Sequence, residues 1–68
     1  MPEVGQIWKE KGTKAIKCYV TWINEDKDRI VALYPDGYTF TWTIEGFIHN
    51  HDFTGDHVPF EDVAAILF

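Results

Sequence analysis

Bulky side chains alternate with threonine from Tyr38 to Ile44, and no other feature constrains the fold of this chain as strongly. A period of two places the bulky set on one face of an extended strand and the threonines on the other. Both sets are strong β-formers. The preceding Pro35-Asp36-Gly37 is a strong turn signal, because proline presets φ and glycine accepts a positive φ. These residues predict a β-hairpin whose first strand spans residues 29–34.

Two earlier segments, residues 6–10 and 15–24, also predict strands, and a polar turn follows each. In the second segment, every other position is apolar, as in a half-buried strand. These apolar positions are Ile16, Cys18, Val20 and Trp22. Residues 45–53 break the alternation, so we predict a short connector there, followed by a turn at residues 54–56.

The C-terminal residues 59–68 have the pattern of a short helix. Pro59 suits the first turn, and Glu61 and Asp62 suit the positive end of the helix dipole. One helical face carries Phe60, Val63, Ala64 and Leu67. The alternative is a final strand over residues 64–68 that pairs with the first strand.

A chain of 68 residues has room for one domain, which we expect to span residues 1–68. Its core is expected over residues 4–53, with a separate apolar segment at residues 59–68. Hydrophobic residues make up 46% of the chain, which is enough for a compact core. Four or five short strands are too few for a sandwich and favour a strongly bent sheet. The predicted fold class is mainly β, a small barrel of four to five antiparallel strands with a short C-terminal helix.

Four segments give the chain a resemblance to a known family. They are Val4-Gly5-Gln6-Ile7-Trp8, Tyr19-Val20-Thr21-Trp22-Ile23, the Pro35-Asp36-Gly37 turn and Thr41-Trp42-Thr43-Ile44-Glu45-Gly46-Phe47. This succession resembles the small SH3-like β-barrel proteins that are common in bacteriophage genomes. The resemblance implies an SH3-like barrel and a habit of binding, and it implies no single activity. In a phage setting, the implied role is to bind and inhibit a host enzyme of nucleic-acid handling or defence.

Cys18 is the only cysteine, so no disulfide can form within the chain and a cysteine-rich zinc module is excluded. Small secreted domains usually rely on disulfides, so we expect a cytoplasmic protein. The N-terminus has no signal-peptide pattern and no run of about 20 apolar residues occurs, so we expect no membrane span. Cys18 is expected in the core and the chain has no serine, so we expect neither enzyme activity nor a cofactor.

Charge is divided unevenly along the chain. All six basic residues lie within the first 29 positions, and residues 1–34 also hold five acids. Residues 35–68 have no lysine or arginine but six acids, Asp36, Glu45, Asp52, Asp56, Glu61 and Asp62. The net charge of the chain is −5. An acidic half of this kind disfavours nucleic acid and favours a protein partner with a basic surface.

Three tryptophans, three tyrosines and five phenylalanines are more aromatic residues than a core of this size holds. If the bulky residues of 38–44 face inward, the candidates for the outer face are Trp8, Tyr19 and Tyr34. Exposed aromatic side chains anchor protein partners or stack on bases. The alternative is that Trp8 and Tyr19 cover the open ends of the barrel. The choice stays open because a one-residue change of register exchanges the two faces of a strand.

His49, His51 and His57 lie within nine residues of one another, beside Asp52 and Asp56. Histidines separated by one residue project to the same side of an extended chain, and a further ligand would complete a zinc site. The alternative is a polar loop whose histidines form local hydrogen bonds or face water. The spacing matches no common zinc motif, so no metal site is predicted and the three histidines are only candidates.

We therefore predict a non-enzymatic interaction protein that docks an acidic, aromatic-rich face on a basic protein. Its site would combine the six acids of residues 35–68 with Trp8, Tyr19 and Tyr34. One alternative is a nucleic-acid-binding barrel that uses Trp8 or Tyr19 with the basic residues Lys9, Lys11, Lys14, Lys17 and Arg29. Another is a structural subunit of a larger assembly or a homo-oligomer. In that case the apolar C-terminal segment would dock on a partner or a second copy, instead of packing across its own barrel.

Overall fold

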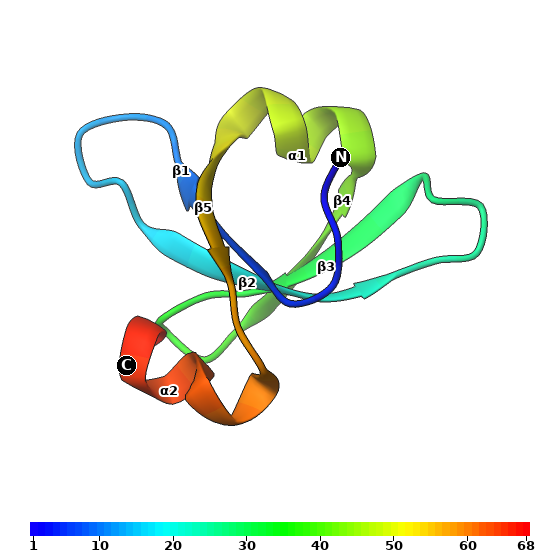
Figure 1. Ribbon diagram of the computed structural model, residues 1–68. Coiled ribbons are helices and arrows are strands. Elements are labelled where there is room, and N and C mark those ends of the chain that lie inside the picture. Colours follow the sequence, from blue (N-terminus) through cyan, green and yellow to red (C-terminus); the bar gives the residue numbers. More distant parts are fainter.

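A single antiparallel sheet of five strands forms the body of the molecule, in the order β4-β3-β2-β1-β5 (Figure 1). The computed structural model describes every residue from Met1 to Phe68. The strands are β1 (Gln6–Glu10), β2 (Lys17–Ile23), β3 (Arg29–Leu33), β4 (Thr39–Thr43) and β5 (His51–His57). Helix α1 (Ile44–Asn50) joins β4 to β5, and a 3₁₀ turn (Phe60–Asp62) leads into α2 (Val63–Leu67). The mainly β fold with a short C-terminal helix is thus confirmed.

Strands β4 and β5 are the two ends of this sheet and do not pair with each other. The sheet is bent, and α1 bridges one end of the gap between the two strands (Figure 1). We call this gap the seam. The predicted antiparallel strands are present, but hydrogen-bonded closure into a barrel is not seen.

Helices α1 and α2 lie on opposite sides of the sheet (Figure 1). An apolar layer of side chains lies beneath each helix. The layer beneath α1 consists of Trp8, Cys18, Val20, Ile30, Ala32, Tyr34, Ile44 and Phe47. The layer beneath α2 consists of Ile7, Tyr19, Val63 and Leu67. Strands β1 and β2 contribute to both layers and are therefore buried on both faces. Neither helix has the length and apolar composition that crossing a membrane requires.

The C-terminal segment is helical and packs on its own chain. Val63 and Leu67 are buried against the outer face of the sheet. The alternative of a final strand over residues 64–68 is wrong, because Val63–Leu67 is a helix. Phe60, predicted on the same helical face, is 68% exposed, because it lies in the 3₁₀ turn and not in α2.

A bulge in β2 turns Trp22 away from the core. Between Val20 and Trp22, β2 advances by two residues while β3 advances by one, so Thr21 is the extra residue. An extra residue exchanges the two faces of the strand beyond it, and Trp22 is accordingly 51% exposed. The alternation in residues 15–24 places Cys18 correctly in the core but places Trp22 wrongly.

Helix α1 and strand β5 replace the connector and the turn predicted after Ile44. Thr43 caps α1, since its hydroxyl accepts a hydrogen bond from a backbone amide of the first turn at 3.0 Å. Within β5, Gly55 has a φ of +92° in the stretch where the register against β1 shifts. The predicted turn around Gly55 is thus a bulge inside a strand. Its glycine and the polar composition of β5 conceal the strand from a pattern-based prediction.

Candidate binding pocket

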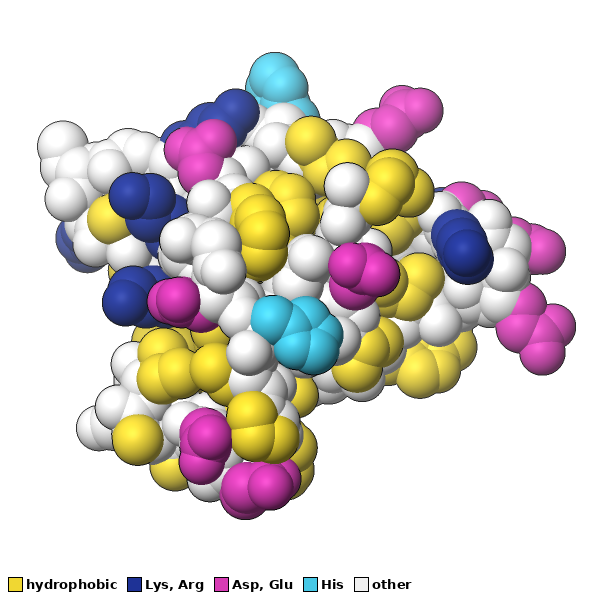
Figure 2. Space-filling model, viewed as in Figure 1, with side chains coloured by type: hydrophobic (Ala, Val, Ile, Leu, Met, Phe, Trp, Pro, Cys, Tyr) yellow, Lys and Arg dark blue, Asp and Glu magenta, His cyan; other side chains and the backbone are white.

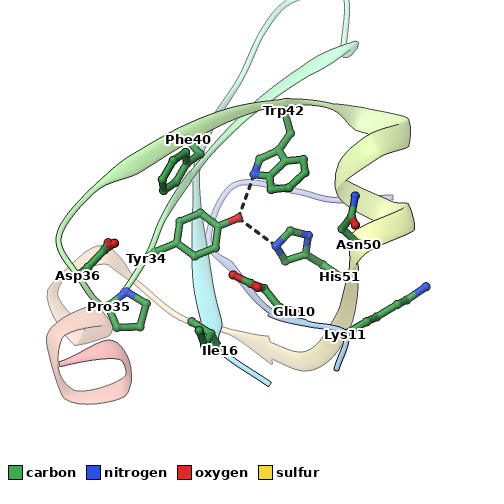
Figure 3. A pocket seen from close by; sticks show the side chains of 10 residues that line it. All are labelled: Glu10, Lys11, Ile16, Tyr34, Pro35, Asp36, Phe40, Trp42, Asn50 and His51. Atoms are coloured by element: carbon green, nitrogen blue, oxygen red, sulfur yellow. Dashed lines mark hydrogen bonds between the residues drawn. The ribbon is translucent and has the colours of Figure 1, made fainter. Parts of the chain in front are cut away.

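A pocket of about 740 Å³ opens along the seam, beside β4 and the start of β5 (Figure 3). Ligand pockets typically measure about 300–1,000 Å³. The lining comes from β4, the end of β1, the turns after β1 and β3, and the junction of α1 with β5. The lining residues are Glu10, Lys11, Ile16, Tyr34, Pro35, Asp36, Phe40, Trp42, Asn50 and His51. The pocket therefore joins parts of the chain that are far apart in sequence.

Three polar side chains form a continuous series of hydrogen bonds in the wall of this pocket (Figure 3). The indole N–H of Trp42 donates to the Tyr34 hydroxyl oxygen at 2.9 Å. That oxygen lies 2.9 Å from Nε2 of His51, and Nδ1 of His51 lies 2.9 Å from the Phe47 carbonyl oxygen. The His51 ring also stacks on the Phe47 ring, with 4.2 Å between centroids. These contacts hold the wall of the pocket in one arrangement.

A neutral His51 ring with its proton on Nδ1 satisfies this series of hydrogen bonds. The Phe47 carbonyl can only accept, so Nδ1 of His51 carries a proton and donates it. Nε2 of His51 then accepts from the Tyr34 hydroxyl, and the imidazole is neutral. Burial lowers the pKa of His51 below its ordinary value of 6.5. Burial also raises the pKa of the Tyr34 hydroxyl, so the wall of the pocket carries no charge at neutral pH.

Glu10 brings a negative charge to this uncharged wall. Glu10 is half-buried as a residue, and its carboxylate lies on the same side of the pocket as Tyr34 and His51 (Figure 3). Burial is the largest cause of the raised pKa of Tyr34, the neighbouring Cys18 comes next, and the charge of Glu10 makes the smallest contribution. Glu10 has no ion-pair partner. The one ion pair of the chain joins Arg29 to Asp28 at 3.5 Å. Lys11 also lines the pocket, but its side chain points away from the aromatic rings (Figure 3).

The three aromatic residues predicted for the outer face are buried. Trp8 is 7% exposed, Tyr19 is 4% exposed and Tyr34 is 5% exposed. Trp8 lies beneath α1 and Tyr19 beneath α2, because β1 and β2 are covered on both faces. The predicted outer aromatic face is therefore wrong, and neither Trp8 nor Tyr19 is accessible for stacking on a base. Tyr34 does belong to the pocket, where it forms part of the wall.

Phe40 and Trp42 are the aromatic residues that the pocket exposes. Their cross-strand partners on β3 are Ala32 and Ile30, which face the layer beneath α1. Phe40 and Trp42 point to the same face, but β4 is the end of the sheet and nothing covers them from the side. Phe40 is 52% exposed and Trp42 is partly exposed. The alternation predicts this strand, but it does not predict that the strand lies at an edge.

The six acids of residues 35–68 do not gather at one site. Asp36 lines the pocket and accepts a hydrogen bond from the Tyr38 amide at 3.0 Å. The other five are exposed in three separate elements, Glu45 in α1, Asp52 and Asp56 in β5, and Glu61 and Asp62 in the 3₁₀ turn. Figure 2 shows acidic side chains scattered over this face, whereas most basic side chains gather near the turn between β1 and β2. Of the acids in the chain, only Asp36 and Glu10 line the pocket.

The three histidines do not form a shared site. His51 is 2% exposed and lies in the wall of the pocket, whereas His49 is exposed on α1. Nε2 of His57 lies 3.1 Å from the Val4 carbonyl oxygen, at the opposite end of β5. No group of three or more His, Cys, Asp or Glu side chains lies close enough to hold a metal ion. The candidate site of three histidines is therefore wrong.

Comparison with known proteins identifies no relative. The chain matches no protein-family model, no curated protein and no solved structure. The resemblance to phage SH3-like barrels therefore rests on the sequence pattern, and function has to be argued from the pocket itself.

Proposed function

We propose that this chain is a non-enzymatic interaction module that binds a basic segment of a partner protein in the pocket along the seam. One observation carries the proposal: Glu10 is half-buried, and its carboxylate lacks an ion pair and lies beside aromatic rings. Aromatic rings attract cations, so a lysine or arginine side chain would supply the missing counter-charge. Asp36 adds a second negative charge to the lining.

A positive side chain gains more in such a pocket than on an open surface. Exposed ion pairs contribute about 0–1 kcal/mol. A cation beside an aromatic ring adds about 0.5–2 kcal/mol, with the larger values where water is excluded. The net charge of −5 also attracts a basic partner at longer range, and this contribution weakens as salt is added.

The proposal retains the partner class that the sequence predicts but changes the residues that bind it. The aromatic contacts come from Phe40 and Trp42 in place of Trp8 and Tyr19. Burial raises the pKa of the Cys18 thiol to about 12, which leaves it unreactive and supports a non-enzymatic role. A lone reduced cysteine also accords with the cytoplasm. Inhibition of a nucleic-acid-handling or defence enzyme is the form of binding that the resemblance implies.

Affinity capture from a bacterial lysate with three forms of the chain tests this function. The pocket variant Glu10→Gln/Asp36→Asn loses two negative charges from the lining, and the control Glu25→Gln/Asp26→Asn loses two from the exposed turn after β2. We expect the wild type and the control to retain one stoichiometric protein that salt releases. The pocket variant should retain about ten-fold less, which corresponds to about 1.4 kcal/mol. Equal retention by all three forms, or no retained protein, would contradict the proposal.

A further inference from the structure

We propose that the partner segment binds as an additional antiparallel strand on the free edge of β4 and directs a lysine or arginine side chain into the pocket. This inference rests on the proposed function and specifies its geometry. It assigns affinity to the backbone of β4 and selectivity to the pocket, which is the general logic of strand addition.

The outer edge of β4 offers backbone groups without partners. The Tyr34 amide donates to the Tyr38 carbonyl, and the Ile44 amide donates to the Asp28 carbonyl, each at 3.0 Å. The backbone groups of Tyr38 and Ile44, which flank β4, therefore face β3. Hydrogen-bonded pairs alternate along an antiparallel ladder, and the register between β3 and β4 is regular throughout. The N–H and C=O groups of Thr39 and Thr41 therefore point away from β3. An added strand would pair with these groups.

No feature of β4 protects this edge from pairing. Proteins normally protect free edges with charges, prolines or bulges. Strand β5, the other edge, has two of these features, the charges of Asp52 and Asp56 and the bulge at Gly55. Strand β4 is Thr-Phe-Thr-Trp-Thr, without charge, proline or bulge. The edge that borders the pocket is thus the one that remains open to a further strand.

Charge favours a basic segment over a second copy of this chain. In an antiparallel strand on β4, the residues opposite Phe40 and Trp42 point to the same face as these rings. That face is the pocket, where the carboxylate of Glu10 is unpaired (Figure 3). A second copy paired through its own β4 would place Phe40 and Trp42 there and would bring a further net charge of −5. A segment with lysine or arginine at every second position supplies both the backbone groups and the counter-charge.

Short peptides of alternating lysine and valine test the inference by calorimetry against the full chain. In the proposed pairing, lysines lie opposite Phe40 and Trp42, and valines lie opposite Thr39 and Thr41. The valine amides then donate to β4, whereas the lysine amides point to water. We expect N-methylation of the valine amides to weaken binding about ten-fold or more, and N-methylation of the lysine amides to change it by about two-fold or less. Equal affinity for the two methylated peptides would overturn strand addition.

Two variants separate this inference from the proposed function. Thr41→Pro removes an outward N–H from β4 while leaving the pairing with β3 intact, so it should weaken the unmethylated peptide about ten-fold. Glu10→Gln should weaken the same peptide through charge alone. Equal affinity for the two methylated peptides together with a loss in Glu10→Gln would overturn strand addition and retain the pocket. No binding of any peptide at millimolar concentration, or a β4-paired dimer that excludes the peptide, would contradict the assignment to a basic partner.

Discussion

The two edge strands of the sheet border the same seam but differ in how they meet solvent. Strand β5 begins at His51, which is 2% exposed and hydrogen-bonded to Tyr34, and it carries Asp52 and Asp56 on a bulged edge. Strand β4 joins the same series of hydrogen bonds through the Trp42 indole N–H, which donates to the Tyr34 hydroxyl at 2.9 Å, but it carries no charge and leaves half of Phe40 exposed. We infer that β5 stabilises the fold, whereas β4 binds the partner.

The anchor of β5 also explains why the wall of the pocket is well defined. Burying a polar ring is costly unless both of its nitrogens find partners. Both nitrogens of His51 have one, and no buried side-chain nitrogen or oxygen in the chain lacks a hydrogen-bond partner. The threonine hydroxyls of β4 need no buried hydrogen-bond partners, because these side chains are exposed and can hydrogen-bond to water. The difference leaves more accessible surface at Phe40 on β4 than at His51 on β5.

Breaking the anchor of β5 should have the largest effect. His51→Ala removes a ring that stacks on Phe47, leaves the Tyr34 O–H without its acceptor and removes a hydrogen bond to the Phe47 carbonyl. We expect the free energy of unfolding to fall by about 3 kcal/mol or more. Urea denaturation measures this change. The control His49→Ala, on the exposed side of α1, should cost about 0.5 kcal/mol or less. Similar losses in the two variants would show that His51 is not an anchor.

The same anchor makes stability depend on pH. Because burial lowers the pKa of His51, the unfolded chain binds a proton more readily than the folded chain does. Stability should therefore be complete above about pH 6.5 and fall as the pH is lowered toward the folded-state pKa. The slope contributed by this group cannot exceed about 1.4 kcal/mol per pH unit. Unfolding measured above the range of ordinary carboxyl titration, about pH 4, isolates the effect.

The variant His51→Gln is the matched test, since glutamine both donates and accepts hydrogen bonds but does not titrate. We expect it to be less stable than the wild type and to lack the pH slope. A slope that persists in His51→Gln would assign the pH dependence to another group.

Removing the protection of β5 should have the smallest effect. Asp52→Thr/Asp56→Thr makes this edge resemble β4, so we expect weak self-association that increases with protein concentration. Sedimentation equilibrium detects it. The control Glu61→Thr/Asp62→Thr changes the net charge equally but lies in the 3₁₀ turn, away from the sheet edge. Equal association of the two variants would mean that net charge, and not edge protection, limits self-association at β5.

Local sequence patterns predict much of this fold, and contacts between distant segments explain what they miss. The alternation around Phe40 predicts β4, and the apolar spacing of Val63 and Leu67 predicts the C-terminal helix. The bulges at Thr21 and Gly55 escape prediction, because an extra residue becomes visible only against the neighbouring strand. They account for the wrong placement of Trp22 and for the missed strand β5.

The candidate site is predicted less well, because it depends on which strands end the sheet. The sequence indicates an acidic and aromatic site with a basic partner, and Asp36 and Tyr34 do line the pocket. The sequence does not predict that the pocket contains Glu10, Phe40 and Trp42, because no local sequence pattern shows that β4 is an edge strand or that Glu10 lies near it. The two-sided burial of β1 and β2, which removes Trp8 and Tyr19 from the surface, depends likewise on helices that come later in the chain.

A nuclear magnetic resonance titration of the wild-type chain with the lysine–valine peptide tests directly whether β4 is the edge that binds the partner. The two edges can then be compared by their amide signals in a single experiment. We predict shifts and slowed hydrogen exchange at the amides of Thr39 and Thr41, and a shift of the Trp42 indole signal. The amides of β5 from Asp52 to Asp56 should remain unchanged. Shifts confined to β5, or an absence of protection at Thr39 and Thr41 when the peptide is bound, would contradict the account.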